Sequence, residues 1–251
     1  MPWEPILLMV MGSLRAVGIV LALPVPGGHP LPPMLRAALS FLIGGLVASV
    51  TPVAAPPPMP TMVALASAAF HELLLGLAMG LLIRTVLSAA ELAGRLIANE
   101  IGLMAAPGFD VPIPSQEPLP AFMAFFGGLI FFAMHAHEGV LSAFAHSFVI
   151  APPGAGGLSP AMAETLVSAV ARLLDLALRM AAPFIALNFV ITFAFAILGR
   201  AVPKMNVFIM SYAMRSLLGM LMLAGGGALF ARYLAGAFER LPWTMLELVA
   251  R

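Results

Sequence analysis

Residues 91–122 read ELAGRLIANEIGLMAAPGFDVPIPSQEPLPAF, a helix-forming run with charged side chains followed by a break that holds five prolines. Proline lacks a backbone N–H donor and disfavours helix for the residue before it, so the helix has to end here. A bilayer accepts irregular backbone only where protein or a water-filled cavity covers it. Because the surrounding chain is apolar, the break is predicted to line a passage.

The rest of the chain has the composition of a membrane protein. Of its 251 residues, 62% are hydrophobic and 9% are charged, whereas soluble domains carry roughly 25% charged residues. The length accommodates about six or seven apolar spans of roughly 20 residues and no further globular domain. We therefore expect an all-α, polytopic membrane protein that forms one integral membrane domain over residues 1–251, with its first helix retained.

Charge and cysteine content exclude several functions. The net charge of +1 offers no broad attraction to nucleic acid. The chain has no cysteine, which excludes disulfides, thiolate metal sites and thiol nucleophiles. Nucleophile-elbow and phosphate-binding motifs are absent from the sequence, so we predict no enzyme activity and no cofactor.

Proline and glycine clusters divide the chain into apolar segments at residues 5–23, 34–50, 62–106, 119–150, 161–199 and 207–241. Several of these segments are longer than a single membrane span requires. Residues 62–106 would extend roughly 67 Å as one helix, so they form either a bent pair or a helix that projects from the membrane. Pro183 and Asn188 predict a kink in residues 161–199. The pair Arg200 and Lys204 marks the best candidate for a cytoplasmic loop.

One helix face in residues 84–102 is polar. Its members follow one another at helical spacings of three or four residues, and Glu91 and Arg95 form a favourable i,i+4 pair. Charges at membrane depth usually face a bundle interior or an aqueous cavity. We predict that this polar stripe faces a partner helix or a lumen; the alternative is a solvated helix end. The stripe comprises Arg84, Ser88, Glu91, Arg95, Asn99 and Gly102.

A second charged ladder consists of Arg172, Asp175 and Arg179, again on one helix face. It is interpreted as an ion ladder at a subunit contact in preference to a proton relay, because no other titratable side chain lies near it in sequence.

Histidines do not suggest a metal centre at the sequence level. On one helix, His135 and His137 would face different sides, and His146 would lie about 16 Å from His135 along the axis. The runs HELLL and HEGVL lack the second histidine of a zinc-protease motif. We therefore predict no metal site. Gly76 and Gly80, by contrast, form a small-residue face that permits close helix approach, as do Gly127-Gly128 and residues 225–227.

Several motifs together resemble the FliR family, the export-gate component of bacterial flagella, whose injectisome counterpart is called SctT. The resemblance covers nearly the whole chain. It rests on Glu72 with Gly76 and Gly80, ELAG at 91–94, IGL at 101–103, Phe109-Asp110, the helix at 120–132, His137, Ser147-Phe148, Pro152, and PKMNVFI at 203–209.

The resemblance implies a non-enzymatic inner-membrane subunit of the flagellar basal body, which assembles with FliP-like and FliQ-like subunits beside FlhB-like and FlhA-like components and passes unfolded proteins. It also implies that one loop plugs the channel. That loop comprises Gly108, Phe109, Asp110, Val111, Pro112, Ile113, Pro114, Ser115, Gln116, Glu117 and Pro118.

Two alternatives remain open at this level. The injectisome version of the gate differs in substrate and attachment rather than in physical principle. A small-molecule permease would use the polar stripe and the charged ladder as a midplane site, but such carriers often show two related halves, and no such repeat is visible in this sequence.

Overall fold

The computed structural model describes residues 4–24, 31–51, 61–103, 117–154 and 159–250, and the regular structure within them is helical. The helices α3, α6 and α7 are each long and apolar enough to cross a membrane, and the bent pair α4 and α5 would make a fourth span. This confirms the predicted all-α, polytopic membrane fold. The helices are α1 (Glu4–Ala22), α2 (Pro33–Val50), α3 (Met62–Glu100), α4 (Pro118–Ala133), α5 (Ala136–Ile150), α6 (Pro160–Ala201), α7 (Val207–Gly225) and α8 (Gly227–Ala250).

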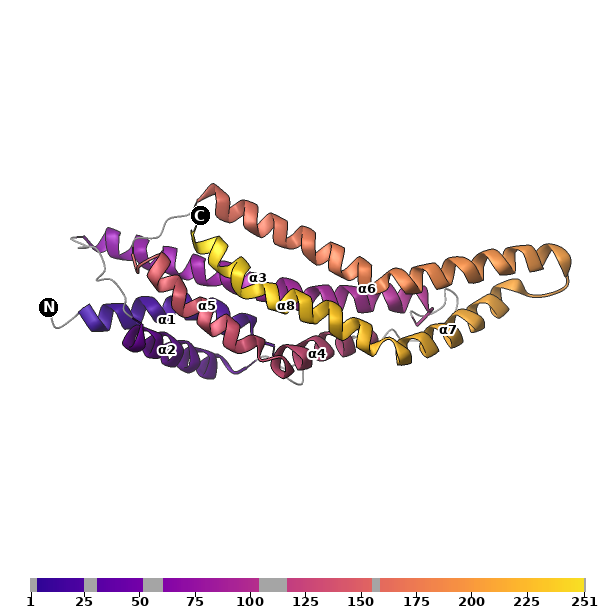
Figure 1. The fold of residues 1–251 in the computed structure, drawn as a ribbon, viewed down its shortest axis with the longest axis horizontal. Coiled ribbons are helices and arrows are strands. Elements are labelled where there is room, and N and C mark those ends of the chain that lie inside the picture. The colour runs from indigo at the N-terminus through magenta and orange to yellow at the C-terminus, as the bar shows by residue number, and fades with distance from the viewer. Residues whose placement is uncertain (1–3, 25–30, 52–60, 104–116, 155–158, 251) are drawn as a thin grey trace.

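Helix α3 is the axis of the molecule. It runs through the middle of the bundle, and α1, α4, α6 and α8 all pack against it (Figure 1). Its 39 residues form a single helix, so of the two arrangements predicted for this segment the long helix is correct. At 1.5 Å per residue α3 extends about 58 Å, roughly twice the thickness of the hydrocarbon core. Met79, Ile83 and Ile97 on its inner face are completely buried.

Glycines bring the backbones of α1 and α3 into direct contact. A Cβ atom on Gly18 would lie 2.0 Å from the backbone of Gly76, and one on Gly80 would lie 2.1 Å from the carbonyl oxygen of Gly18. In the same way, a Cβ on Gly44 of α2 would lie 2.3 Å from the backbone nitrogen of Ser13 in α1. Backbone atoms cannot rotate away, so these positions exclude any side chain. The predicted close approach at Gly76 and Gly80 is confirmed.

The segment predicted at residues 119–150 is broken into two helices. The chain bends by 70° between α4 and α5, and Met134 and His135 lie at the bend. The bend rests on α8: the ring centroids of Phe131 and Phe238 are 5.3 Å apart, and a Cβ on Gly139 would lie 2.9 Å from Pro242. The bend is therefore fixed by tertiary packing as well as by the local break.

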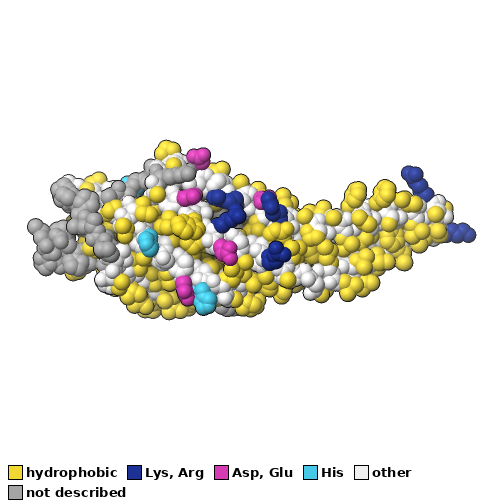
Figure 2. Space-filling model, viewed as in Figure 1, with side chains coloured by type: hydrophobic (Ala, Val, Ile, Leu, Met, Phe, Trp, Pro, Cys, Tyr) yellow, Lys and Arg dark blue, Asp and Glu magenta, His cyan; other side chains and the backbone are white. Residues whose placement is uncertain are grey.

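The first half of α6 runs along the bundle, and its second half forms with α7 a hairpin that projects from one end (Figure 1). The 42-residue α6 contains Pro183 and changes direction part-way along its length, as predicted. Large apolar side chains cover the hairpin: Phe189 is 71% exposed, Phe193 62% and Leu221 63%. Figure 2 shows this apolar surface with basic side chains at its tip, where Arg200 and Lys204 are exposed.

The glycines at residues 225–227 act differently from the prediction. A Cβ on Gly225 or Gly227 would meet nothing within 4 Å. These two residues therefore mark the break between α7 and α8 and do not support close helix packing.

Candidate functional site

The C-terminus of α3 is closed by a glycine cap directly before the proline-rich break. Gly102 has a φ of 74°. Its N–H donates to the carbonyl oxygen of Asn99 at 3.3 Å, and the N–H of Leu103 donates to that of Ala98 at 2.9 Å. This pair of bonds is a Schellman motif, which satisfies carbonyls that the helix end would leave unpaired. The cap fixes the direction in which the chain leaves α3.

Side chains from α6 and α7 hold this cap in place. The hydroxyl of Tyr212 donates to the carbonyl oxygen of Gly102, and the amide of Asn188 donates to the carboxylate of Glu100. A Cβ on Gly219 would lie 2.3 Å from Cγ2 of Ile101, so α7 packs tightly against the helix end. Asn188, predicted as part of a kink, thus has a specific role in anchoring α3.

The start of α4 lies beside the same end of α3. A Cβ on Gly94 would lie 2.8 Å from Cα of Pro120, so α4 begins within a few residues of the end of α3 and runs back along it, with Gly127 next to Ala90. Glu117 is the N-cap residue of α4. Its Oε2 atom is buried and has no hydrogen-bond partner among the described residues. The two described residues that flank residues 104–116 therefore lie at the same end of the α3–α4 pair.

Most of the predicted plug lies outside the described residues. This holds for Gly108 through Gln116, whereas Glu117 and Pro118 are described at the start of α4. The plug therefore stays a prediction, with both of its attachment points defined.

The polar stripe lies on the outer surface of this chain. Arg84, Arg95 and Asn99 are exposed, while Ser88 and Glu91 are half-buried. Arg95 donates to Oε1 of Glu91 at 2.8 Å, as the i,i+4 spacing predicts. The opposite face of α3 is buried against the rest of the bundle. In an isolated chain the stripe thus faces outward, and what it faces in an assembly stays a prediction.

The second ladder is also exposed. Arg179 donates to Oδ2 of Asp175 at 2.8 Å, with 62% and 59% of the two side chains exposed. Arg172 donates to the hydroxyl of Ser168 and does not join the Asp175 pair. The ladder is therefore one ion pair and one neighbouring arginine along the outer face of α6.

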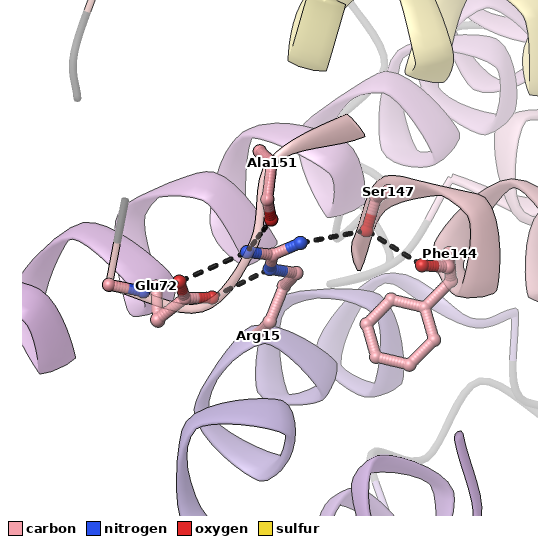
Figure 3. A network of polar contacts seen from close by, with 6 residues as sticks. Arg15, Glu72, Phe144, Ser147 and Ala151 are labelled. Atoms are coloured by element: carbon pink, nitrogen blue, oxygen red, sulfur yellow. Dashed lines mark hydrogen bonds and ion pairs between the residues drawn. The ribbon is translucent and has the colours of Figure 1, made fainter. Parts of the chain in front are cut away.

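A buried ion pair was not predicted from the sequence. Nε of Arg15 in α1 donates to Oε2 of Glu72 in α3 at 2.6 Å, and a second nitrogen donates to Oε1 at 3.0 Å (Figure 3). Both side chains are almost fully buried. The glycine contacts between α1 and α3 explain this pairing, because Glu72, Gly76 and Gly80 share one face at spacings of four. An arginine within the first apolar segment was the available signal, since such charges have partners.

The network extends to the segment that leads from α5 toward α6. Arg15 also donates to the hydroxyl of Ser147 and to the carbonyl oxygen of Ala151, each at 3.0 Å. The N–H of Gly154 donates to Oε1 of Glu72 at 3.1 Å, and the guanidinium carbon lies 4.2 Å from the ring centroid of Phe148. Charge pairing and hydrogen bonds offset the cost of removing both ions from water. The network joins three parts of the chain that are distant in sequence.

Comparisons with known proteins agree with this architecture. The chain is 28% identical to the flagellar biosynthetic protein FliR of Aquifex aeolicus, over 88% of this chain and 85% of that protein. It is 25% identical to the FliR protein of Caulobacter vibrioides over 84% of each chain. It is also 29% identical to the Yop proteins translocation protein T of Yersinia pestis, over 61% of this chain and 59% of that protein.

The comparison with family models identifies the family. The model described as bacterial export proteins, family 1, matches residues 6–241. This range includes the buried Arg15 network, the α3–α4 pair and the projecting hairpin. It also includes α1 apart from the first residues of that helix. The resemblance to FliR proteins inferred from the sequence is confirmed, and the chain belongs to the family of bacterial export proteins, family 1.

Proposed function

We propose that this protein is a non-enzymatic subunit of the flagellar type III export gate in the bacterial inner membrane, where it forms part of the channel for unfolded proteins. The observation that carries the proposal is the family match over residues 6–241 together with a polytopic fold in which α6 and α7 are poorly covered by the chain itself. A chain that buries so little of α6 and α7 completes its packing with lipid or with other subunits. Energy for export comes from other components.

Exposed charges on α3 and α6 support assembly with partner chains. Arg84 on α3 and the Asp175–Arg179 pair on α6 lie on the outer surface of strongly apolar helices. Ionised groups at membrane depth face protein or water and avoid lipid. These two surfaces are therefore the proposed contacts with FliP-like and FliQ-like subunits and with the channel, next to FlhB-like and FlhA-like components.

Charge reversal tests the α6 contact. Asp175→Lys should reduce the amount of FliP-like and FliQ-like subunits that co-purify with the chain, because it places three cations along one face. Glu239→Lys changes an exposed carboxylate on α8 and is the matched control. If both variants co-purify as much of the FliP-like and FliQ-like subunits as the wild type does, α6 is not part of the proposed interface.

Residues 108–118 act as a plug in this proposal. The support is local: α3 ends in a rigid cap held by Tyr212, and α4 starts beside it at Pro118 with a buried, unpaired carboxylate oxygen on Glu117. In this proposal the prolines of the segment restrict its backbone, because each fixes its own φ angle. Phe109 and Ile113 would fill the lumen until a substrate displaces them.

Deletion of residues 112–117 tests the plug. The resting conductance of vesicles that contain the assembled gate should rise, because the lumen is no longer filled. Deletion of residues 53–58, six residues from another proline-rich connection, is the length-matched control and should leave the membrane ion-tight. The same preparations are checked for retained partner subunits. If the assembled 112–117 deletion conducts no more than the wild type, residues 108–118 are not the plug.

A virulence injectisome gate is the second candidate. The match to the Yersinia translocation protein favours it, whereas the longer match to FliR of Aquifex aeolicus favours the flagellar gate. Motility and needle assembly in a deletion strain distinguish the two, since each requires its own gate. Loss of motility alone supports the flagellar function.

A further inference from the structure

The bend between α4 and α5 has an unusual backbone. Within the described ranges, His135 is the one non-glycine residue with a positive φ, at 56°, and it occupies the N-cap position of α5 without a side-chain capping bond. A left-handed conformation is strained for a non-glycine residue, and such residues gather at ligand sites and switch regions. Packing of the bend against α8 holds the residue in this state.

The bend brings three potential metal ligands together. His135, His137 and Glu138 each offer a ligand atom, and these atoms lie within 4.8 Å of one another. On one continuous helix the two histidines would face different sides. That geometry does not apply, because His135 precedes α5 and its backbone is not right-handed helical. The ring centroids of the histidines are 5.8 Å apart.

The polar atoms in this cluster retain capacity for a ligand. Nδ1 of His135 lies 2.9 Å from Oε1 of Glu138; when this nitrogen carries the proton, Nε2 keeps its lone pair, an arrangement common for metal-binding histidines. Nδ1 of His137 is buried and has no hydrogen-bond partner among the described residues. A buried polar atom without a partner is unfavourable, and the ring of His137 therefore has a nitrogen that no protein group among the described residues satisfies.

The surroundings suit an ion with nitrogen and oxygen ligands. The rings of Phe131 and Phe132 lie 6.4 and 5.5 Å from the ring of His137, between centroids. These rings form an apolar wall on the His137 side of the cluster, whereas His135 and Glu138 are open to solvent. Two imidazoles and one carboxylate are ligands that zinc and its neighbours accept.

We propose that His135, His137 and Glu138 bind one divalent transition-metal ion of the zinc class, which ties the bend residue His135 to the first turn of α5. Three protein ligands leave a fourth position for water. Bonds of about 2.1 Å place tetrahedral ligand atoms roughly 3.4 Å apart, so the side chains close slightly on binding. His135 and Glu138 have exposed fractions of 71% and 68% and are free to rotate. The site is independent of the export function proposed above.

Metal titration of the full chain tests the site. Metal-stripped protein in detergent is titrated with Zn²⁺ against a chromophoric chelator, and Co²⁺ absorption reports on tetrahedral coordination. One saturable site per chain is expected. His135→Gln, His137→Gln and Glu138→Gln should each weaken binding at least about tenfold. His146→Gln is the matched control, because His146 is exposed on α5 outside the cluster and bonds to the carbonyl oxygen of Ser142.

The result can overturn the proposal in several ways. Absence of saturable Zn²⁺ binding, or unchanged affinity in the His135 and Glu138 variants, leaves only an exposed hydrogen-bonded pair at the bend. Equal weakening in His146→Gln assigns the ion to nonspecific surface binding. His135 and Glu138 are exposed, so their substitution leaves the packing intact, and elution of the variants as wild type in size-exclusion chromatography checks this point.

Discussion

Nε of Arg15 and Oε2 of Glu72 lie 2.6 Å apart inside the bundle, with side-chain exposures of 1% and 2%. The two residues come from helices whose backbones touch at Gly18 and Gly76. Removal of either partner would leave a buried charge without compensation, whereas removal of both leaves an apolar gap. The pair therefore acts as a specific connection between α1, α3 and the segment after α5.

Glu72→Ala should reduce the free energy of unfolding by about 3–5 kcal/mol, because the Arg15 charge stays buried without its partner. The double variant Arg15→Met, Glu72→Leu should recover most of this loss. Thermal unfolding of the detergent-solubilised protein measures both. Glu91→Ala removes a partly exposed ion pair on the same helix and should cost less than about 1 kcal/mol. Similar losses of unfolding free energy for the two glutamate variants would show that the buried pair contributes no more stability than the exposed pair.

Gly76→Ala should destabilise the protein by at least about 3 kcal/mol, since its new methyl group meets backbone rather than a movable side chain. The carbonyl oxygen of Arg15 would lie 2.1 Å from it. Gly236→Ala in α8 is the control, because a Cβ there meets nothing within 4 Å; it should stabilise the helix by about 0.5–1 kcal/mol. Opposite signs in thermal unfolding are expected, and equal signs would contradict the close approach.

Tyr212→Phe should loosen the cap at the end of α3. It removes the hydrogen bond to Gly102, which is worth about 1 kcal/mol. Tyr233→Phe is the matched control, because Tyr233 packs against the apolar core through its ring. Hydrogen exchange of the amides of Gly102 and Leu103 reports the effect, and faster exchange is expected for the Tyr212 variant alone. Unchanged exchange there would mean that Tyr212 does not hold the cap.

Lys204→Cys should be labelled from the cytoplasm. The tip of the α6–α7 hairpin carries Arg200 and Lys204, and positive residues are retained on that side. The chain has no native cysteine, so an impermeant maleimide reports one position at a time. Glu164→Cys is exposed near the other end of α6 and should react from the opposite side. Labelling of Lys204→Cys in intact cells without permeabilisation would show that the orientation is opposite to the predicted one.

Local sequence patterns were sufficient to predict several structural features. Gly76 and Gly80 share a helix face whatever they pack against, so their spacing alone predicted close approach, and the i,i+4 spacing of Glu91 and Arg95 predicted their ion pair. Helical spacing failed for His135, because it assumed a continuous helix. The bend depends on contacts with Phe238 and Pro242, which are about one hundred residues away in the chain.

The resemblance of its motifs to known proteins indicated the export family, whereas composition and proline breaks by themselves determined that this is an all-helical, polytopic membrane protein. These properties follow from hydropathy and from backbone constraints that act within a few residues. Tertiary structure alone decided that Arg15 meets Glu72, that Tyr212 holds the end of α3, and that His135, His137 and Glu138 converge. Each depends on how distant helices approach, and that approach is fixed by packing summed over the whole bundle rather than by any local pattern.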